Sequence, residues 1–437
     1  MNYKSTEELY ALFTNCKQKI TTDTRKLEPG SIFFALKGDN FDANTFAQKA
    51  IDGGCSYAIV DNELVANGTS ILLVNNVLES LQQLAKHHRK QLGLPVIGIT
   101  GSNAKTTHKE LINAVLSKKY KVYATKGNLN NHIGVPLTLL SLTAEHEIAI
   151  IEMGANHQGE IALLSDLSDP DYGVITNIGK AHLEGFGGVE GIKKGKSELY
   201  RQIEKKNGQI FINADDEVLL ELSGTIRKIT YGIQREYDVY GNLIENSEFV
   251  ELTWNTKNNE LAHRPVVKTN MFGHYNFINV LCAICIGHYF KVDETSINKA
   301  LEEYVPEMNR SQVKKTENNT LILDAYNANP SSMGLAIENF VKQPFEQKLL
   351  VLGDMLELGE YSYMEHEKII EKVKDSGQDV VFVGNLFYEL KHKYPQFAFY
   401  KTADELASFF ERSKASNRTV LIKGSRGIKL EKIVEFL

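Results

Sequence analysis

The chain has 437 residues, of which 42% are hydrophobic and 24% are charged, and its formal net charge is −6 at pH 7. This length exceeds what one hydrophobic core covers, so roughly two to four domains are expected. The acidic balance leaves no basic footprint for nucleic acid, and no stretch approaches the ~20 apolar residues of a membrane span.

The first segment, residues 1–93, alternates short strands with helices. It is polar at its start and has no apolar core of a signal peptide, and the chain has only four scattered cysteines, which suits a reducing compartment. We therefore expect a cytoplasmic protein without membrane insertion. Apolar patterning predicts strands at 31–36, 57–60 and 70–74 and helices at 43–52 and 77–91.

Residues 94–305 are expected to form a second, larger unit. Buried strands are predicted at 95–100, 148–152, 173–177 and 209–213, with a helix from Lys105 to Lys118 and further helices at 277–289 and 295–304. The polar, strand-like segment 226–268 is interpreted as a β-rich insertion. Cys282 and Cys285 have the spacing of metal ligands, but they lie in an apolar helical run and are expected to be buried structural residues.

Residues 306–437 alternate strand and helix regularly. Strands are predicted at 320–325, 349–353, 379–384 and 419–423, with helices at 331–342 and 363–375, from Leu386, from Ala403 and at the C-terminal end. Strands that are apolar on both faces indicate a doubly wound, largely parallel sheet. The fold class is therefore α/β with three units.

The segment from Gly101 to Thr107 has the chemistry of a phosphate loop. Backbone N–H groups and the helix dipole would face an anion, Lys105 would add a positive charge, and a threonine hydroxyl would bind Mg²⁺. The alternative is a plain turn between strand and helix. Ala104 replaces the glycine usual before the lysine, and if its φ is positive, alanine costs on the order of 1 kcal/mol there. Ala104→Gly is then expected to tighten ATP binding.

Polar side chains also follow the neighbouring strands. Glu152 ends an apolar strand and His182 lies just past the next one, at the edge where open α/β sheets bind ligands. With a threonine of the phosphate loop, they would supply the few protein ligands that Mg²⁺ takes. The loop 125–136 carries three asparagines and two glycines, which suits either polar recognition or simple turn formation.

Taken together, these segments resemble the Mur ligases of peptidoglycan synthesis. The matching segments are Gly101 to Thr107, Gly127 to Pro136, Glu152 to His157 and Ala181 to Phe186. Within that family, Asp324 to Met333, Leu352 to Glu360 and Leu421 to Gly427 resemble the member that adds D-alanyl-D-alanine, and Asp23 to Arg25 and Gly30 to Gly38 fit a UDP-binding domain.

The resemblance implies three domains and one reaction. Residues 1–93 would bind the UDP-linked substrate, residues 94–305 would form a P-loop ATPase-like domain, and residues 306–437 would form a Rossmann-like ligase domain. The implied activity is ATP-dependent joining of D-Ala-D-Ala to UDP-N-acetylmuramoyl-tripeptide through an acyl phosphate. The implied cofactors are ATP and Mg²⁺, the partners are these small-molecule substrates, and the chain is expected to be a monomer.

The resemblance also implies roles for individual residues. Lys105, Lys196, His182 and Arg310 would be catalytic, and Lys196 would be N-carboxylated, whereas without the resemblance Lys196 is a solvated member of a basic run. The nucleotide would meet Gly101, Ser102, Asn103, Ala104, Lys105, Thr106, Thr107, Asn276, Asn279, Arg310 and Asp324. Metal ligands would come from Thr106, Thr107, Glu152, His182 and Lys196. The other substrates would meet Asp23, Thr24, Arg25, Asn128, Asn130, Asn131, Tyr326, Asn327, Lys423, Ser425 and Arg426.

Two alternatives remain open at this point. The chain could be another amino-acid ligase of the same family, although the segment Tyr326 to Pro330 argues against the diaminopimelate-adding one. It could also be a catalytically weak relative that binds nucleotide and UDP-linked precursor, because Ala104 and His108 depart from the residues usual in the family's phosphate loop.

Overall fold

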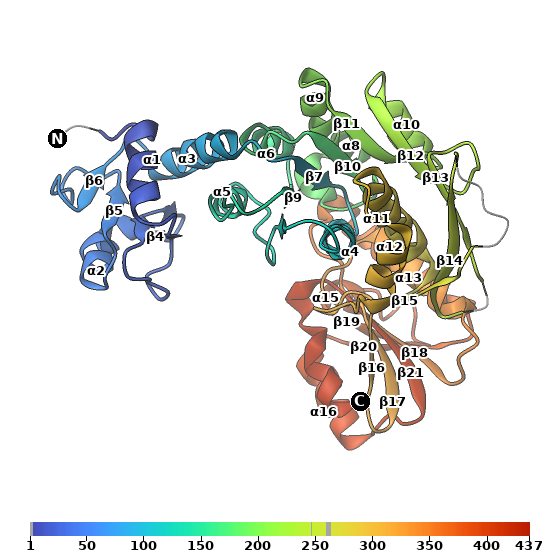
Figure 1. Ribbon diagram of the computed structural model, residues 1–437. Coiled ribbons are helices and arrows are strands. Elements are labelled where there is room, and N and C mark those ends of the chain that lie inside the picture. The colour runs from blue at the N-terminus through green and yellow to red at the C-terminus, as the bar shows by residue number, and fades with distance from the viewer. Residues whose placement is uncertain (1–2, 246, 259–263) are drawn as a thin grey trace.

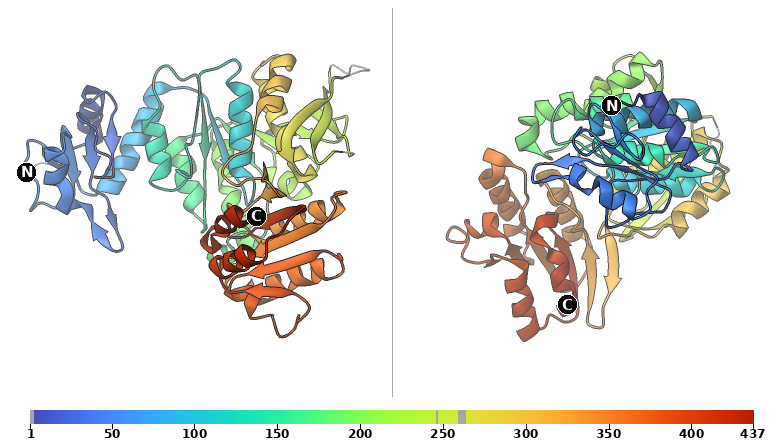
Figure 2. Two further views of the ribbon diagram at one scale, coloured as in Figure 1. Left: turned by 90° about the horizontal axis from the view of Figure 1, so that it is seen from below. Right: turned by 90° about the vertical axis from the view of Figure 1, so that its left-hand side faces the viewer.

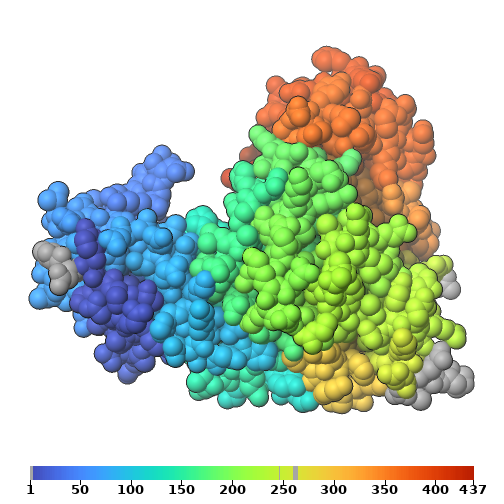
Figure 3. Space-filling model, turned by 90° about the horizontal axis from the view of Figure 1, so that it is seen from above, coloured from blue at the N-terminus to red at the C-terminus, as the bar shows by residue number. Residues whose placement is uncertain are grey.

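The computed structural model describes residues 3–245, 247–258 and 264–437, and these contain three main sheets. The units built on these sheets follow one another along the chain, and the two outer units project from the central one (Figures 1 and 2). Seen from above, the molecule is hollowed between its N-terminal and C-terminal units (Figure 3). Within the described residues, no helix is both long and apolar enough to cross a membrane.

The N-terminal sheet has four parallel strands in the order β1-β2-β5-β6. Its central strands are short and apolar on both faces, because helices cover them, and β2 is fully buried. Its elements are α1 (Thr6–Asn15), β1 (Ile20–Thr21), β2 (Ile32–Phe34), the hairpin β3 (Lys37–Gly38) and β4 (Phe41–Asp42), η1 (Ala43–Phe46), α2 (Ala47–Asp52), β5 (Tyr57–Val60) and β6 (Ile71–Leu73).

Helix α3 (Val77–Leu92) joins the N-terminal unit to the central one. Gly93, with φ of 63°, ends it in the left-handed conformation that glycine adopts without strain. Along this helix, the side chains of Gln82, His88 and Arg89 donate hydrogen bonds to backbone carbonyls of the central unit. A packed helix, rather than a flexible linker, therefore connects the two units.

The central sheet has nine strands in the order β15-β14-β13-β12-β11-β10-β7-β9-β8. All neighbours from β8 to β13 are parallel, and β14 and β15 are added antiparallel. The strands are β7 (Val96–Thr100), β8 (Val122–Ala124), β9 (Ile148–Glu152), β10 (Tyr172–Ile175), β11 (Gln209–Asn213), β12 (Arg227–Gly232), β13 (Val239–Leu243), β14 (Phe249–Thr256) and β15 (Val267–Phe272).

Helices cover the central sheet on both faces. The buried cysteines 282 and 285 lie on α11, as predicted. The helices are α4 (Lys105–Leu116), α5 (Gly134–Leu140), α6 (Glu160–Ser168), α7 (Leu183–Phe186), α8 (Val189–Lys196), α9 (Glu198–Lys205), α10 (Glu217–Ser223), η2 (His274–Asn276), α11 (Phe277–Tyr289) and α12 (Glu294–Glu303).

Two predictions for the central unit were wrong in part. Segment 226–268 is rich in strands, but it is no insertion: β12 pairs with β11 in parallel, so the segment extends the central sheet. The loop expected over 125–136 ends early, because α5 begins at Gly134. A Cβ at Gly134 would come within 2.4 Å of the Leu129 backbone, so this close turn requires glycine.

The C-terminal sheet has the order β16-β17-β21-β18-β19-β20 and is parallel except for the edge strand β16. Sequence periodicity missed β16 and β20, and the helix expected at the C-terminal end is 3₁₀ rather than α. The elements are β16 (Gln312–Lys315), β17 (Asn319–Leu323), α13 (Pro330–Lys342), β18 (Lys348–Gly353), η3 (Gly359–Tyr361), α14 (Ser362–Lys374), β19 (Asp379–Val383), α15 (Asn385–Tyr388), β20 (Ala398–Tyr400), α16 (Ala403–Arg412), β21 (Arg418–Lys423), η4 (Arg426–Ile428) and η5 (Leu430–Phe436).

Candidate active site

The loop between β7 and α4 leads into the N-terminus of a helix, where backbone N–H groups can bind an anion, and we call residues 101–104 the cradle. Gly101 has φ of 145°, and a Cβ there would lie 1.9 Å from the Thr176 hydroxyl oxygen, so glycine is required. The Ser102 hydroxyl donates to the Gly179 carbonyl at 2.9 Å, and the Asn103 N–H donates to the Asn177 side chain at 3.0 Å. Bonds to the loop after β10 therefore hold this loop in shape.

Ala104 is the N-cap of α4 and has φ of 59° and ψ of 15°. This is the left-handed conformation, which is strained for alanine. The position has no side-chain cap bond, because alanine offers no acceptor. Ala104 therefore has the positive φ at which the sequence predicts a cost for alanine.

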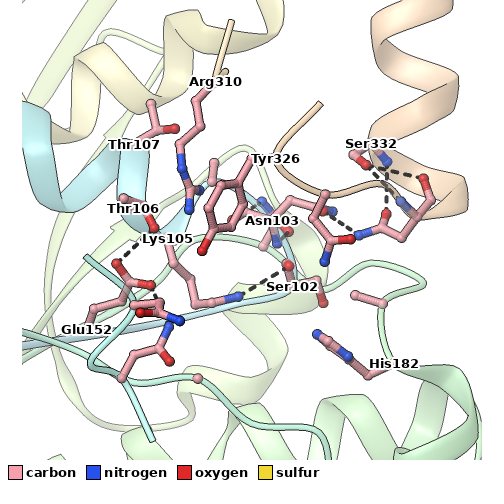
Figure 4. Close-up of a pocket in the computed structure, with 18 of the residues that line it drawn as sticks. Ser102, Asn103, Lys105, Thr106, Thr107, Glu152, His182, Arg310, Tyr326 and Ser332 are labelled. Carbon is pink, nitrogen blue, oxygen red and sulfur yellow. Dashed lines mark hydrogen bonds between the residues drawn. The ribbon is translucent and has the colours of Figure 1, made fainter. Parts of the chain in front are cut away.

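Lys105 begins α4 and lies in the middle of the pocket (Figure 4). Its ammonium donates to the Gly101 carbonyl at 2.7 Å, within its own loop. Burial lowers the pKa of Lys105, the nearby Glu152 carboxylate opposes that shift, and the Arg310 charge adds to it. An anion in the cradle would supply the counter-charge that the lysine lacks.

Glu152, at the end of β9, is held by bonds to both of its carboxylate oxygens. The Thr106 hydroxyl donates to Oε2 at 2.9 Å, and the Asn130 amide donates to Oε1 at 2.8 Å. The fully buried Lys109 lies 3.8 Å from Oε2 and donates to the Thr125 carbonyl at 2.6 Å. Two hard oxygen donors, from Thr106 and Glu152, thus meet at one point beside the cradle.

Sequence reasoning missed Lys109. A lysine four residues after Lys105 falls on the same side of α4, which was a usable signal. The helix packs that face against the sheet and so buries the side chain completely, next to the carboxylates of Glu110 and Glu152.

His182 follows β10 and points into the pocket from the central unit (Figure 4). Its Nδ1 is paired with the carboxylate of Glu357, which belongs to the C-terminal unit. This contact lowers the pKa of Glu357. Glu357 was not among the predicted residues, since nothing in its local sequence indicates that it crosses to another unit.

Lys196 is the last residue of α8 and is buried, although its neighbours in the basic run are not. Its ammonium donates to the Ala155 carbonyl at 3.2 Å and lies 4.8 Å from the centre of the Phe186 ring. Within the described part of the chain, no carboxylate lies at ion-pair distance from it. Burial, reinforced by the Lys105 charge, lowers the pKa of Lys196 well below its ordinary value.

Asn276 and Asn279 meet where η2 leads into α11, and both are buried. Asn279 donates to the Asn276 side-chain oxygen at 2.7 Å. Asn276 in turn donates to the Phe272 carbonyl at 2.7 Å and to the Ser311 hydroxyl at 3.3 Å. The pair therefore presents fixed amides at one end of the pocket.

The C-terminal unit contributes the opposite wall. Asp324 follows β17 and is paired with the buried Lys423 at 2.6 Å. The Arg310 guanidinium lies 3.6 Å from the centre of the Tyr326 ring. The Asn329 amide donates to the Asn103 side chain of the phosphate loop at 2.6 Å, so α13 docks directly on the cradle.

These residues enclose a cavity of about 630 Å³ between the two units. Most of the predicted nucleotide, metal and substrate residues line it: Ser102, Asn103, Ala104, Lys105, Thr106, Thr107, Asn128, Asn130, Asn131, Glu152, His182, Asn276, Asn279, Arg310, Asp324, Tyr326, Asn327 and Lys423. Three groups are not part of its lining. Gly101 and Lys196 belong to the central unit, Ser425 and Arg426 to the C-terminal unit, and Asp23, Thr24 and Arg25 to the distant N-terminal unit.

The residues outside the cavity have partners of their own. Asp23 receives bonds from the backbone and the guanidinium of Arg25, and these lower its pKa to about 2. The Ser425 hydroxyl accepts a hydrogen bond from the Leu356 N–H at 2.9 Å, so this side chain holds the backbone of the loop after β18. Their predicted contacts with substrate remain predictions.

Comparison with known proteins gives consistent matches along the chain. Residues 99–287 match the Mur ligase middle domain, and residues 309–426 match the Mur ligase, glutamate ligase domain. The UDP-N-acetylmuramoyl-tripeptide–D-alanyl-D-alanine ligase of Bacillus subtilis is 36% identical over 435 residues, covering 96% of this chain and 92% of that protein.

Two solved structures have the same architecture. MurF from Acinetobacter baumannii superposes with a TM-score of 0.86 at 32% identity, covering 95% of this chain and 92% of that one. The MurF ligase from Thermotoga maritima in complex with ADP superposes with a TM-score of 0.85 at 26% identity, covering 96% and 97%.

Proposed function

The chain belongs to the Mur ligase family, and we propose that it joins D-alanyl-D-alanine to UDP-N-acetylmuramoyl-tripeptide while converting ATP to ADP and phosphate. One observation carries the proposal. The phosphate loop, Glu152 and His182 of the central unit face Arg310 and Asp324 of the C-terminal unit across one cavity. The end-to-end similarity to ligases with this activity supports it.

Each unit takes one part of the task. Residues 1–93 hold the UDP end of the precursor, with Asp23, Thr24 and Arg25 at that site. Residues 94–305 bind ATP, and residues 306–437 bring the dipeptide, with Lys423, Ser425 and Arg426 on that side. Because the reacting groups come from different units, closure of the C-terminal unit completes the site.

The nucleotide lies along the cavity, from the buried amides to the phosphate loop. Asn276 and Asn279 face the adenine, Asp324 accepts from the ribose, and the cradle with Lys105 and Arg310 surrounds the phosphates. The two cations neutralise charge on the transferring phosphoryl group. Because the loop is rigid, its charged and N–H groups need not rearrange during the transfer. A relative with the same fold, solved in complex with ADP, supports nucleotide binding.

The donor set beside the cradle fits Mg²⁺. This ion prefers oxygen ligands and takes few from the protein, leaving positions for phosphate oxygens and water. Thr106 and Glu152 already point at each other from 2.9 Å and would share the first ion. His182 would bind a second ion through Nε2, because its Nδ1 side faces Glu357. When bound, Mg²⁺ neutralises phosphate charge and orients the oxygens.

Lys196 fits N-carboxylation. Reaction with CO₂ requires a neutral amine, and burial without a carboxylate partner among the described residues favours that form. The neutral nitrogen forms a bond to the CO₂ carbon while one C–O π bond breaks, and it then loses one proton to solvent, so the amine becomes a carbamate anion. Its oxygens resemble a carboxylate and are suitable Mg²⁺ ligands. NMR with ¹³C-labelled bicarbonate tests this: a carbamate carbon signal is expected for the wild type and none for Lys196→Arg.

The reaction proceeds in two transfers. A carboxylate oxygen of the tripeptide attacks the γ-phosphorus of ATP, the bond to the bridging oxygen breaks, and ADP leaves. The amine of D-Ala-D-Ala then attacks the carbonyl carbon of the acyl phosphate. The tetrahedral intermediate loses a proton and expels phosphate, which leaves the amide. Lys105 and Arg310 hold the phosphoryl oxygens through the first transfer.

Phosphate release from Mg-ATP tests the proposal directly. The assay contains UDP-N-acetylmuramoyl-tripeptide ending in diaminopimelate or in lysine, with and without D-Ala-D-Ala. Release that needs both substrates, together with a UDP-linked pentapeptide, is expected, and the faster tripeptide identifies the third residue. Nucleotide binding with neither release nor pentapeptide would instead indicate a precursor-binding relative.

A further inference from the structure

The side chain of Arg310 lies against the aromatic ring of Tyr326. The guanidinium carbon lies 3.6 Å from the ring centre, which is a stacked cation–π contact (Figure 4). The Arg310 Nε is buried and has no hydrogen-bond partner among the described residues. A second guanidinium, that of Arg426, lies 5.4 Å from the centre of the same ring. The Tyr326 ring is thus the contact that orients the Arg310 side chain.

The residue that follows Arg310 contacts the central unit. This residue, Ser311, is buried, and its hydroxyl bonds with Tyr275 at 3.0 Å and accepts from Asn276 at 3.3 Å. Both partners belong to the central unit, at the end of the cavity assigned to adenine. The start of the connection to the C-terminal sheet is therefore fastened to the nucleotide-binding unit.

The connection is also conformationally unusual. Met308, Asn309 and Ser311 all have left-handed backbones, with φ of 56°, 55° and 51°. Residues other than glycine avoid this region, and strained backbone persists only where surrounding contacts hold it. Arg310 thus leaves a constrained turn in a fixed direction, and that direction leads to Tyr326.

Tyr326 comes from the C-terminal unit, three residues after β17. The N–H of Asp324, between the strand and the ring, donates to the Ile422 carbonyl of β21 at 3.0 Å, so the segment that carries the ring is fastened to the C-terminal sheet. Arg310 stands two residues before β16, and Gln312 of β16 is paired with Leu323 of β17, so Arg310 and Tyr326 lie beyond the adjacent ends of one hairpin of the C-terminal sheet. The pair therefore belongs to the edge of the C-terminal sheet, and the Ser311 contacts join this edge to the central unit.

We propose that Tyr326 is a positioning residue, which acts through Arg310 and places its guanidinium at the γ-phosphate of ATP when the C-terminal unit closes. The Tyr326 ring supplies a flat surface for the guanidinium of Arg310. This contact does not neutralise the guanidinium charge and does not use the guanidinium N–H donors. Those donors stay available for a phosphoryl group. The inference rests on the proposed function, in which Arg310 faces the nucleotide phosphates.

Calorimetric titration of the full chain with Mg²⁺ present tests the inference. The two titrants are ADP and the β,γ-imido analogue of ATP, and the ratio of their dissociation constants measures the contribution of the γ-phosphate. We expect Arg310→Ala to abolish most of this ratio and Tyr326→Leu to reduce it roughly 5- to 20-fold. Tyr326→Phe, which keeps the ring, should restore it to within about twofold of wild type, as only the ring is needed.

Two further variants separate positioning from structure. Tyr388→Leu is the matched control: its ring also lies near two cations, Lys391 and Lys401, at 5.1 and 5.0 Å, but away from the cavity, and it should leave the ratio unchanged. The double variant of Arg310→Ala and Tyr326→Leu should be no weaker than Arg310→Ala alone, because the two residues act as one unit.

The outcomes divide clearly. A ratio that falls in Arg310→Ala but not in Tyr326→Leu overturns the positioning role alone. A Tyr326→Phe variant as weak as Tyr326→Leu also overturns it, since the hydroxyl and not the ring would then matter. An unchanged ratio in Arg310→Ala overturns the phosphate assignment of Arg310 and this inference with it. Should Tyr326→Leu lose ADP binding through misfolding, Arg310→Lys gives the same test, because lysine keeps the charge but cannot stack as a plane.

Discussion

Ala104 is the position where a single substitution should improve the phosphate loop. Its left-handed backbone, with φ of 59°, costs an alanine roughly 1–2 kcal/mol. Glycine avoids that cost but adds about 0.4–1 kcal/mol of chain entropy to the unfolded state. The net expectation for Ala104→Gly is a gain of about 0.5–1 kcal/mol in the free energy of unfolding, or ~2 °C in the melting temperature of the central unit.

The same change should act on ATP. Glycine increases the fraction of molecules in which the loop amides are aligned for phosphate, so the affinity for Mg-ATP is expected to rise by up to about fivefold. Differential scanning calorimetry and titration calorimetry measure the two effects separately. Ala104→Val is the matched control: a β-branched residue is worse in the left-handed region and should move both quantities the other way.

Gly101→Ala provides the opposite test in the same loop. Its Cβ would come 1.9 Å from the Thr176 hydroxyl, so we expect a loss of about 2–3 kcal/mol. If Ala104→Gly lowers the melting temperature or weakens ATP binding, the strain argument for the loop is refuted, because relief of strain cannot have either effect.

Two further predictions concern pH and closure. Burial lowers the pKa of His108 to about 4 from its ordinary 6.5. As the pH falls, the unfolded state therefore binds a proton before the folded state does. The free energy of unfolding is expected to drop by up to about 3 kcal/mol between pH 6.5 and pH 4. His108→Thr should flatten this dependence in urea titrations at pH 7 and pH 4.5, and an unchanged slope would contradict it. Lys180 of the central unit pairs with the buried Glu365 of the C-terminal unit at 2.7 Å, and Lys180→Met should shift the units toward an open arrangement by about 1 kcal/mol. Small-angle scattering should show a larger radius of gyration for Lys180→Met than for the wild type. Lys368→Met is the control, because Lys368 pairs with Glu365 within the C-terminal unit, and it should leave the radius unchanged. Equal radii for all three proteins would show that the pair of Lys180 and Glu365 does not hold the units together.

Local patterns in the sequence determined the α/β class and the position of the loop that is predicted to bind phosphate. A strand such as 148–152 is apolar at every position because helices cover both sheet faces, and that signal needs no knowledge of the rest of the chain. The loop before Lys105 was equally visible, since glycine, lysine and threonine at this spacing between a strand and a helix are typical of a phosphate loop. The possible backbone strain at Ala104 was also predicted from its place in the motif, where glycine is usual.

Burial of charged residues was decided only by tertiary packing. Lys196 stands in a run of three lysines, and composition favours solvent for all of them, yet packing against Phe186 and Ala155 buries this one alone. Lys109 is buried for the same reason, between α4 and the strand that ends at Glu152. A periodic pattern reports which face of a helix is apolar, but not which cation the neighbouring segment will cover.

Contacts across units were equally beyond the reach of local patterns. Arg310 and Tyr326 meet because β16 pairs with β17, and sequence periodicity missed β16. The bond of Ser311 to Tyr275 then joins this edge of the sheet to the central unit. The pair of His182 and Glu357 depends wholly on how two folded units meet. The sequence by itself thus determined which chemistry is present, and the tertiary structure decided which groups face one another, because orientation between units is set by their packed surfaces and not by spacing along the chain.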